Sequence, residues 1–177
     1  PTAVVVNKYG TRAYVICSLS GTVSVVDLST GTLFTSLPLD ETTPVDAVLD
    51  QDEENLFVIS RDSPNLTIVD TSTLTVTDKI YVGMGAVSIV ADDLSGLVLV
   101  GRKFGREIAL VDPSALMPVD TIRLESAAGP MALDRQQNAL LVSIPEKGVV
   151  QKVNLVSKKI MSEMKIDLIP SAVAVVE

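Results

Sequence analysis

The chain has 177 residues, of which 47% are hydrophobic and 20% are charged, so its composition is that of a folded domain with a sizeable core. Its 14 basic and 22 acidic residues give a net charge of −8, which is the wrong sign for a nucleic-acid-binding surface. It has no His and a single Cys, which excludes His-based catalytic pairs, His-ligated metals and an internal disulfide, and no apolar run is long enough to span a membrane.

The first 43 residues contain four short runs of β-branched and apolar residues, separated by turn residues such as Gly10, Gly21 and Gly31. Runs of about five such residues form strands rather than helices. Loops of a few residues make consecutive strands antiparallel neighbours. We therefore expect a four-stranded meander built from Ala3–Val6, Ala13–Cys17, Val23–Val26 and Leu33–Leu37.

The same pattern recurs along the rest of the chain. The third runs end at Asp27, Asp70, Asp112 and Asn154. These end residues are spaced 43, 42 and 42 positions apart. The first run occurs five times, at Val4–Val6, Ala47–Leu49, Ile89–Ala91, Met131–Leu133 and Val173–Val175. This periodicity predicts repeats at about 1–43, 44–85, 86–127 and 128–169, with the first strand of a further repeat at 170–177.

The strands are apolar on both faces. Leu97–Val100 and Ala139–Val142 have apolar residues at consecutive positions, which is the pattern of a sheet covered on both sides. Four-stranded units of this length, stacked radially, form a β-propeller. We predict an all-β fold with four complete four-stranded antiparallel blades plus the first strand of a fifth. We expect it to be part of a propeller of about six to eight blades, with closure by a second chain as the alternative.

The stretch 1–17 resembles the first half of the YVTN repeat, which defines a family of β-propellers. The matching residues are Pro1, Val4, Val6, Gly10, Tyr14 and Val15, and the segment 21–27 with Thr30 resembles the second half. Glu53 and Gln137 depart from the pattern, because they replace the turn Gly. The resemblance implies that the first strand of each repeat lies innermost, around a central channel. It also implies a protein similar to secreted and surface-layer propellers of bacteria and archaea, outside the cytoplasm.

The residues that end the third strands have a structural interpretation. An Asp or Asn before a short turn accepts hydrogen bonds from backbone N–H groups of that turn. The alternative, a ring of carboxylates binding a metal, is disfavoured because each residue belongs to a different blade. We therefore expect turn caps, and no metal site, at Asp27, Asp70, Asp112 and Asn154.

The second turns of the blades are rich in cations. With the strand order of the family they share one face, opposite the acidic first and third turns that carry Asp50, Asp52, Asp92 and Asp93. We name this the second-turn face, and its candidate binding residues are Arg61, Arg102, Lys103, Phe104, Arg106 and Lys147. Three cations and an aromatic ring on one loop suit an anionic ligand or an acidic partner. The alternative is an ordinary exposed loop.

Three functions remain open from the sequence. The first is a non-catalytic interaction scaffold of a secreted or cell-surface protein, which uses no cofactor and binds a protein partner or the remaining blades of the same propeller. The second is the propeller part of a redox enzyme or cofactor-binding subunit whose active-site residues lie outside this chain. The third is a lactonase-like propeller hydrolase, which needs carboxylates converging on the channel. The missing catalytic residue types favour the scaffold.

Overall fold

The computed structural model describes residues 1–40, 43–166 and 170–175. In this part of the chain every regular element is a β-strand, and the strands form four separate four-stranded sheets. No helix that is long and apolar enough to cross a membrane occurs among these residues.

Each sheet is a meander of strands that follow one another in the chain and pair antiparallel. The first two sheets consist of β1 (Ala3–Val6), β2 (Arg12–Cys17), β3 (Thr22–Asp27) and β4 (Thr32–Pro38), and of β5 (Pro44–Leu49), β6 (Asn55–Ser60), β7 (Asn65–Asp70) and β8 (Thr75–Tyr81). The other two consist of β9 (Ala86–Asp92), β10 (Leu97–Arg102), β11 (Glu107–Asp112) and β12 (Met117–Arg123), and of β13 (Met131–Asp134), β14 (Ala139–Ile144), β15 (Val149–Asn154) and β16 (Ile160–Lys165).

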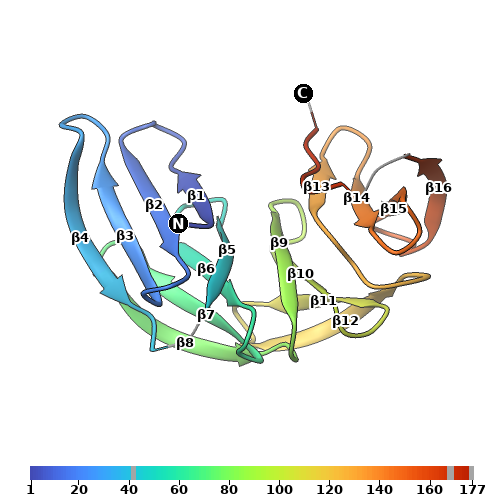
Figure 1. Ribbon diagram of the computed structural model, residues 1–177, viewed down its shortest axis with the longest axis horizontal. Helices are drawn as coiled ribbons and strands as arrows, with labels where there is room; N and C mark the ends of the chain where they lie inside the picture. The colour runs from blue at the N-terminus through green and yellow to red at the C-terminus, as the bar shows by residue number, and fades with distance from the viewer. Residues whose placement is uncertain (41–42, 167–169, 176–177) are drawn as a thin grey trace.

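The four sheets are arranged as the blades of a β-propeller (Figure 1). The first strands of consecutive blades contact one another, β1 with β5, β5 with β9 and β9 with β13, so they form the inner side of the fan. The fourth strand of each blade forms its outer edge. The blades make an open arc, with the β1–β4 and β13–β16 sheets at its two ends (Figure 1).

The hydrophobic core is divided into three clusters, one between each pair of consecutive blades. Between the first and second blades, for example, Tyr14 and Ile16 pack with Leu56 and Val58, and all of these are buried. Each fully buried side chain of this size contributes about 1.5–3 kcal/mol. A single blade buries neither of its apolar faces, so the blades are stable only as a stack.

A β-bulge occurs at the same repeat position in every blade. It lies between the third and fourth strands, at Val25/Val26, Ile68/Val69, Leu110/Val111 and Lys152/Val153. A bulge adds one unpaired residue and increases the local right-handed twist. The outer hairpin of each blade is therefore bent and twisted in the same way.

Polar bonds between blades join residues about one repeat apart. The Thr2 hydroxyl donates to the Pro44 carbonyl, 42 residues away, at 3.2 Å. The Arg135 guanidinium donates to the Asp93 carboxylate, also 42 residues away, at 2.9 Å. Equivalent positions of neighbouring blades therefore lie side by side, as radial stacking requires.

The strand predicted at 170–177 is not formed in the described part of that segment. Residues 170–175 contain no strand, and residues 176–177 lie outside the described residues. An innermost strand pairs with the second strand of its own blade, and the described residues contain no such strand after 170–175. Without that neighbour the backbone N–H and C=O groups have no ladder to join.

Candidate ligand and partner face

The residues that end the third strands bind the turns that follow them. Asp27 Oδ1 accepts hydrogen bonds from the backbone N–H groups of Ser29 at 2.8 Å and Thr30 at 3.1 Å. Asn154 Oδ1 accepts the corresponding bonds from residues 156 and 157, at 3.1 and 2.8 Å. The hydrogen bond from the Ser29 hydroxyl, followed by that from the Thr30 N–H, lowers the pKa of Asp27.

Asp70 and Asp112 have the same geometry. Asp112 accepts N–H bonds from Ser114 at 2.9 Å and Ala115 at 3.1 Å. The Thr73 N–H donates to the Asp70 carboxylate at 2.7 Å. This bond is the largest of the causes that lower the pKa of Asp70 to about 2. Among the described residues there is no group of three or more His, Cys, Asp or Glu side chains that could hold a metal ion.

On the second-turn face, the loop that follows β10 lies against the connection between the second and third blades. The Lys103 N–H donates to the Gly85 carbonyl at 2.8 Å. A Cβ added to Gly85 would lie 2.4 Å from Phe104 Cδ2, and one added to Gly83 would lie 2.4 Å from Arg102 Nη1. Both glycines also have positive φ, +87° for Gly83 and +80° for Gly85. The loop can approach this closely only because both positions lack a side chain.

Arg102 is the least exposed cation of this loop. Its side chain is 21% exposed, and its nearest carboxylate, on Glu107, lies 3.9 Å from Nη2. The Nε atom is buried and has no hydrogen-bond partner among the described residues. The Arg102 carbonyl accepts the Ala128 N–H at 3.2 Å, which joins the loop to the next connection between blades.

The rest of the loop is presented to solvent. Phe104 is 59% exposed, with the Lys103 ammonium 4.8 Å from its ring centroid. The exposed Arg106 lines a groove of about 400 Å³ that also contains Gly105 and Arg123. Of the candidate binding residues only Arg106 lines this groove, which also contains a carboxylate, Glu107.

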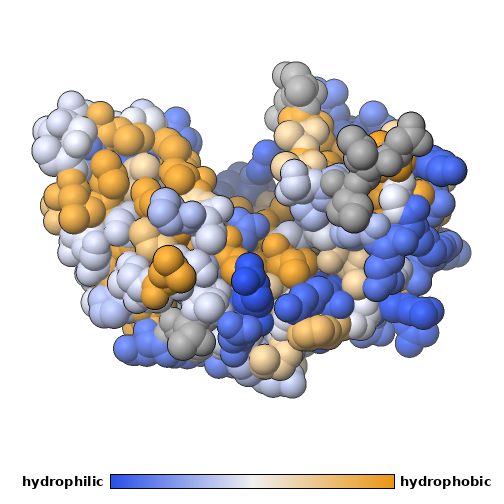
Figure 2. All heavy atoms as spheres, viewed as in Figure 1, coloured by the Kyte–Doolittle hydropathy of each residue, from blue (hydrophilic) through white to orange (hydrophobic). Residues whose placement is uncertain are grey.

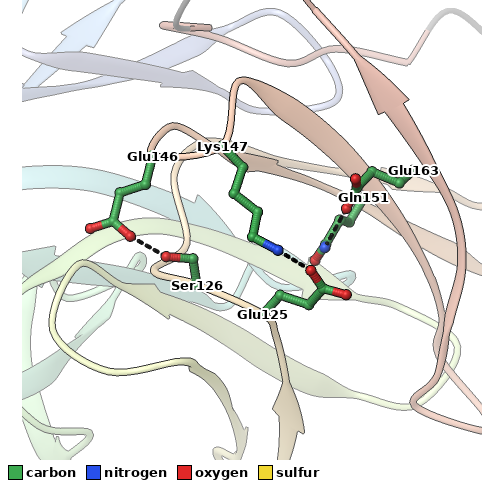
Figure 3. Close-up of polar contacts among 6 residues, drawn as sticks. All are labelled: Glu125, Ser126, Glu146, Lys147, Gln151 and Glu163. Atoms are coloured by element: carbon green, nitrogen blue, oxygen red, sulfur yellow. Dashed lines mark hydrogen bonds and ion pairs between the residues drawn. The ribbon is translucent and has the colours of Figure 1, made fainter.

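Lys147 does not add a free cation to this group. Its ammonium pairs with Glu125 in the connection between the third and fourth blades (Figure 3). In the same view the Ser126 hydroxyl donates to Glu146, and the buried Gln151 donates to Glu163 at 2.9 Å. Glu125 from the neighbouring connection compensates the charge of Lys147, and a cationic second-turn face that includes Lys147 stays a prediction.

Arg61 lies apart from the loop, on the second turn of the second blade. It is exposed, and its backbone N–H donates to the Thr43 carbonyl at 3.0 Å. The neighbouring Asp62 accepts a hydrogen bond from the Thr43 hydroxyl at 2.8 Å. The candidate cations of the second-turn face are therefore concentrated on the third blade.

The opposite face contains a cleft that sequence reasoning did not identify. It has a volume of about 400 Å³, lies between the second and third blades and has Phe57, Ile68 and Leu97 in its lining. Five carboxylates also line it: Asp50, Asp52, Asp78, Asp92 and Asp93. The sequence indicated that most of these acids share a face. They belong to different turns and to strands β8 and β9, so only the stacking of the blades brings them to one cleft.

Asp46, in the middle of the inner strand β5, was also missed. Its Oδ2 accepts the Ile89 N–H at 3.4 Å and its Oδ1 accepts the Ala47 N–H at 3.0 Å. Burial raises the pKa of this carboxyl group. A single acidic residue in a valine-rich run was the available signal, and it marks a polar contact between the first strands of two neighbouring blades.

Comparisons with known proteins bear on the fold. No protein-family model matches the chain, and no curated protein matches it. Its structure is similar to that of hydrazine synthase from Kuenenia stuttgartiensis, with a TM-score of 0.86 at 17% sequence identity. The likeness covers 94% of this chain and 49% of the hydrazine synthase chain, so this chain spans about half the length of that protein. At this identity the likeness shows the fold alone.

The architecture and this likeness define the class of the protein. It is an all-β propeller chain whose blades are four-stranded antiparallel sheets. The resemblance to the YVTN family stays a prediction, because it rests on the sequence pattern only.

Proposed function

We propose that this chain is a non-catalytic binding scaffold of a secreted or cell-surface protein, and that loop 102–106 on the second-turn face binds an acidic protein partner. The single observation that carries the proposal is the close seating of Arg102 and Phe104 on Gly83 and Gly85. A loop that is already held by packing loses little conformational entropy when it binds.

The chemistry of the loop specifies the partner. Lys103 and Arg106 are exposed cations, and Arg pairs with carboxylates through two parallel hydrogen bonds. Phe104 and the nearby Met84, which is 46% exposed, offer apolar surface beside them. An acidic segment that contains an apolar or aromatic residue satisfies both requirements. Location outside the cytoplasm is supported by the resemblance to YVTN proteins.

The binding proposal is tested with a fluorescein-labelled polyglutamate peptide that contains one phenylalanine, followed by fluorescence anisotropy. We expect binding that weakens as NaCl rises, because exposed charges are screened. Arg106→Glu removes one attraction and adds one repulsion, so we expect it to weaken binding by about tenfold or more.

The matched control is Lys159→Glu, which makes the same charge change at an exposed site in the third turn of the fourth blade. We expect it to change the affinity by less than about twofold, because the six-residue strand β15 separates its turn from the second-turn face and exposed charges that far apart are screened. Equal weakening by both variants would show that only net charge matters, and an absence of binding to the peptide would overturn the proposal.

A second candidate is the propeller part of a redox enzyme or cofactor-binding subunit. One observation favours it, the structural likeness to hydrazine synthase, which carries over the fold alone. Absorption of the purified protein between 350 and 600 nm, typical of haem or quinone and absent from the polypeptide, would favour this candidate over the scaffold.

A further inference from the structure

The cleft between the second and third blades, which we call the acidic cleft, has a counterpart between the third and fourth blades. The counterpart has a volume of about 490 Å³ and is formed by the same repeat positions. Phe57 and Ile68 in the acidic cleft correspond to Leu99 and Leu110 in the counterpart, each 42 positions later. Both clefts therefore result from the way in which neighbouring blades stack, and their chemistry depends on the side chains at equivalent positions.

The counterpart has an apolar lining, and we call it the apolar cleft. Four positions that are polar in the acidic cleft are apolar here. The exchanged pairs are Asp52 and Leu94, Asn55 and Leu97, Thr77 and Val119, and Ser114 and Val156. Leu94, Val119 and Val156 are 74%, 50% and 77% exposed. Hydrophobic side chains also gather over the β1–β4 sheet at one end of the arc (Figure 2), whereas the apolar cleft lies within the arc, between two blades. Exposed apolar side chains that surround a hollow, rather than being scattered singly, indicate a binding surface.

The two clefts differ in charge at a further shared position. In the apolar cleft Asp120 pairs with the Lys158 ammonium, so its charge is compensated. The corresponding residues in the acidic cleft are Asp78 and Leu116, which cannot form such a pair. Among the described residues no Lys or Arg belongs to the lining of the acidic cleft.

The other carboxylates of the acidic cleft are held mainly by uncharged groups. Asp50 accepts a hydrogen bond from a side-chain amide at 2.8 Å, and Asp92 accepts one from a hydroxyl at 2.6 Å. Such bonds fix the carboxylates without cancelling their charge. Asp93 differs, because the Arg135 guanidinium donates to it at 2.9 Å. The acidic cleft therefore keeps a negative charge beside an apolar floor, and it favours a cation.

The two clefts adjoin each other. Asp92, the last residue of β9, and Leu97, the first residue of β10, line both of them. A partner that crosses the turn between these strands contacts a negatively charged hollow and an apolar hollow in succession. We call the two hollows together the paired clefts.

We propose that the paired clefts bind a basic segment of a partner protein that carries apolar residues close to its Lys or Arg. The cation enters the acidic cleft, and the apolar side chains enter the apolar cleft, where Asp120 is already compensated by Lys158. Charge complementarity decides the occupant, because an acidic or uncharged apolar segment leaves the carboxylates of the acidic cleft without a partner charge. The paired clefts lie on the face opposite loop 102–106, so the inference is independent of the function proposed above.

The test uses fluorescein-labelled peptides with two lysines and two leucines separated by two to six glycines, and it follows fluorescence anisotropy with the 177-residue protein. The range of spacers lets the lysines and leucines reach both hollows. We expect at least one peptide to bind, with an affinity that falls as NaCl rises. Replacing both lysines by glutamates, or both leucines by serines, should weaken binding by about tenfold or more.

The double variant Asp52→Asn with Asp78→Asn removes two exposed charges from the acidic cleft. We expect it to weaken peptide binding by about tenfold and to reduce the salt dependence. The matched control is Asp27→Asn with Asp70→Asn, which removes two charges from third turns on the same face but outside both clefts. Asn154 makes the same turn bonds naturally, so the control should fold and should change the affinity by less than about twofold.

Leu94→Ser with Val156→Ser tests the apolar cleft. It should also weaken binding by about tenfold, and it should leave the salt dependence unchanged because no charge is altered. Leu19→Ser, at a fully exposed turn outside both clefts, should have no effect. Failure of every peptide to bind, or equal weakening by the two pairs of Asn substitutions, would overturn the proposal. Self-association of the protein that the peptides inhibit would also overturn it, because a second copy would then be the occupant.

Discussion

At the scale of single residues, the turn caps show how local chemistry repeats in four places. Asp27, Asp70 and Asp112 each accept two backbone N–H bonds from the turn that follows, and Asn154 makes the same bonds without a charge. Short-range bonds of this kind depend only on residues two and three positions ahead. For this reason they were predictable from the sequence.

Asp70 should give a measurable pH dependence of stability. Its pKa in the folded chain is about 2, below the ordinary value of 3.8, so its contribution is complete above about pH 4 and is lost as the pH falls through about 2. We expect Asp70→Asn to keep most of the stability at pH 7, as Asn154 does naturally, and to weaken the pH dependence between 4 and 2. Asp70→Ala should lower stability at pH 7 as well. Urea unfolding at pH 7, 4 and 2 measures both, and equal slopes with pH in all three proteins would contradict the expectation.

At the scale of elements, the loop 102–106 and the connection 83–85 form one unit. Neither segment contains a strong signal by itself, since a Gly-Met-Gly triplet and a basic turn are both common. Their pairing depends on how the third blade docks on the second, through bonds such as Lys103 N–H to the Gly85 carbonyl. The sequence indicated loop 102–106 as a candidate site, but it did not indicate that the connection 83–85 packs against this loop.

Gly85→Ala tests this unit. The new Cβ would lie 2.4 Å from the Phe104 ring, on a backbone with φ of +80°. Gly10→Ala is the matched control, because Gly10 has φ of +66° and no heavy atom within 4 Å of the added Cβ. We expect Gly10→Ala to cost about 1 kcal/mol for the left-handed conformation, and Gly85→Ala to cost more and to weaken peptide binding. Denaturant unfolding checks the difference, and equal costs would mean that Phe104 does not depend on this contact.

At the scale of the whole molecule, stability comes from the interfaces between blades. Val15 and Val58 occupy equivalent repeat positions. A preceding blade covers Val58, which is buried, whereas Val15 is only partly buried. We expect Val58→Ala to lower the free energy of unfolding by about 2 kcal/mol, since it removes two buried methyl groups and leaves a cavity. Val15→Ala should cost clearly less, because Val15 is only partly buried. Denaturant unfolding measures both variants, and equal losses would contradict the expected effect of this difference in burial.

The sequence by itself determined the strands, their order within each blade and the period of the repeat. These follow from β-propensity, short turns and apolar positions that recur every 42 or 43 residues, all of which are local or periodic properties. The bulge shared by the four outer hairpins gave no such signal.

Only the tertiary structure decided which charges meet. Lys147 pairs with Glu125, 22 residues earlier, and the carboxylates of the acidic cleft come from two blades, so their contacts depend on the docking of separately folded sheets. The tertiary structure also decided which apolar faces are covered. A valine has the same preferences at every repeat, and whether it is buried depends on whether a neighbouring blade lies over it.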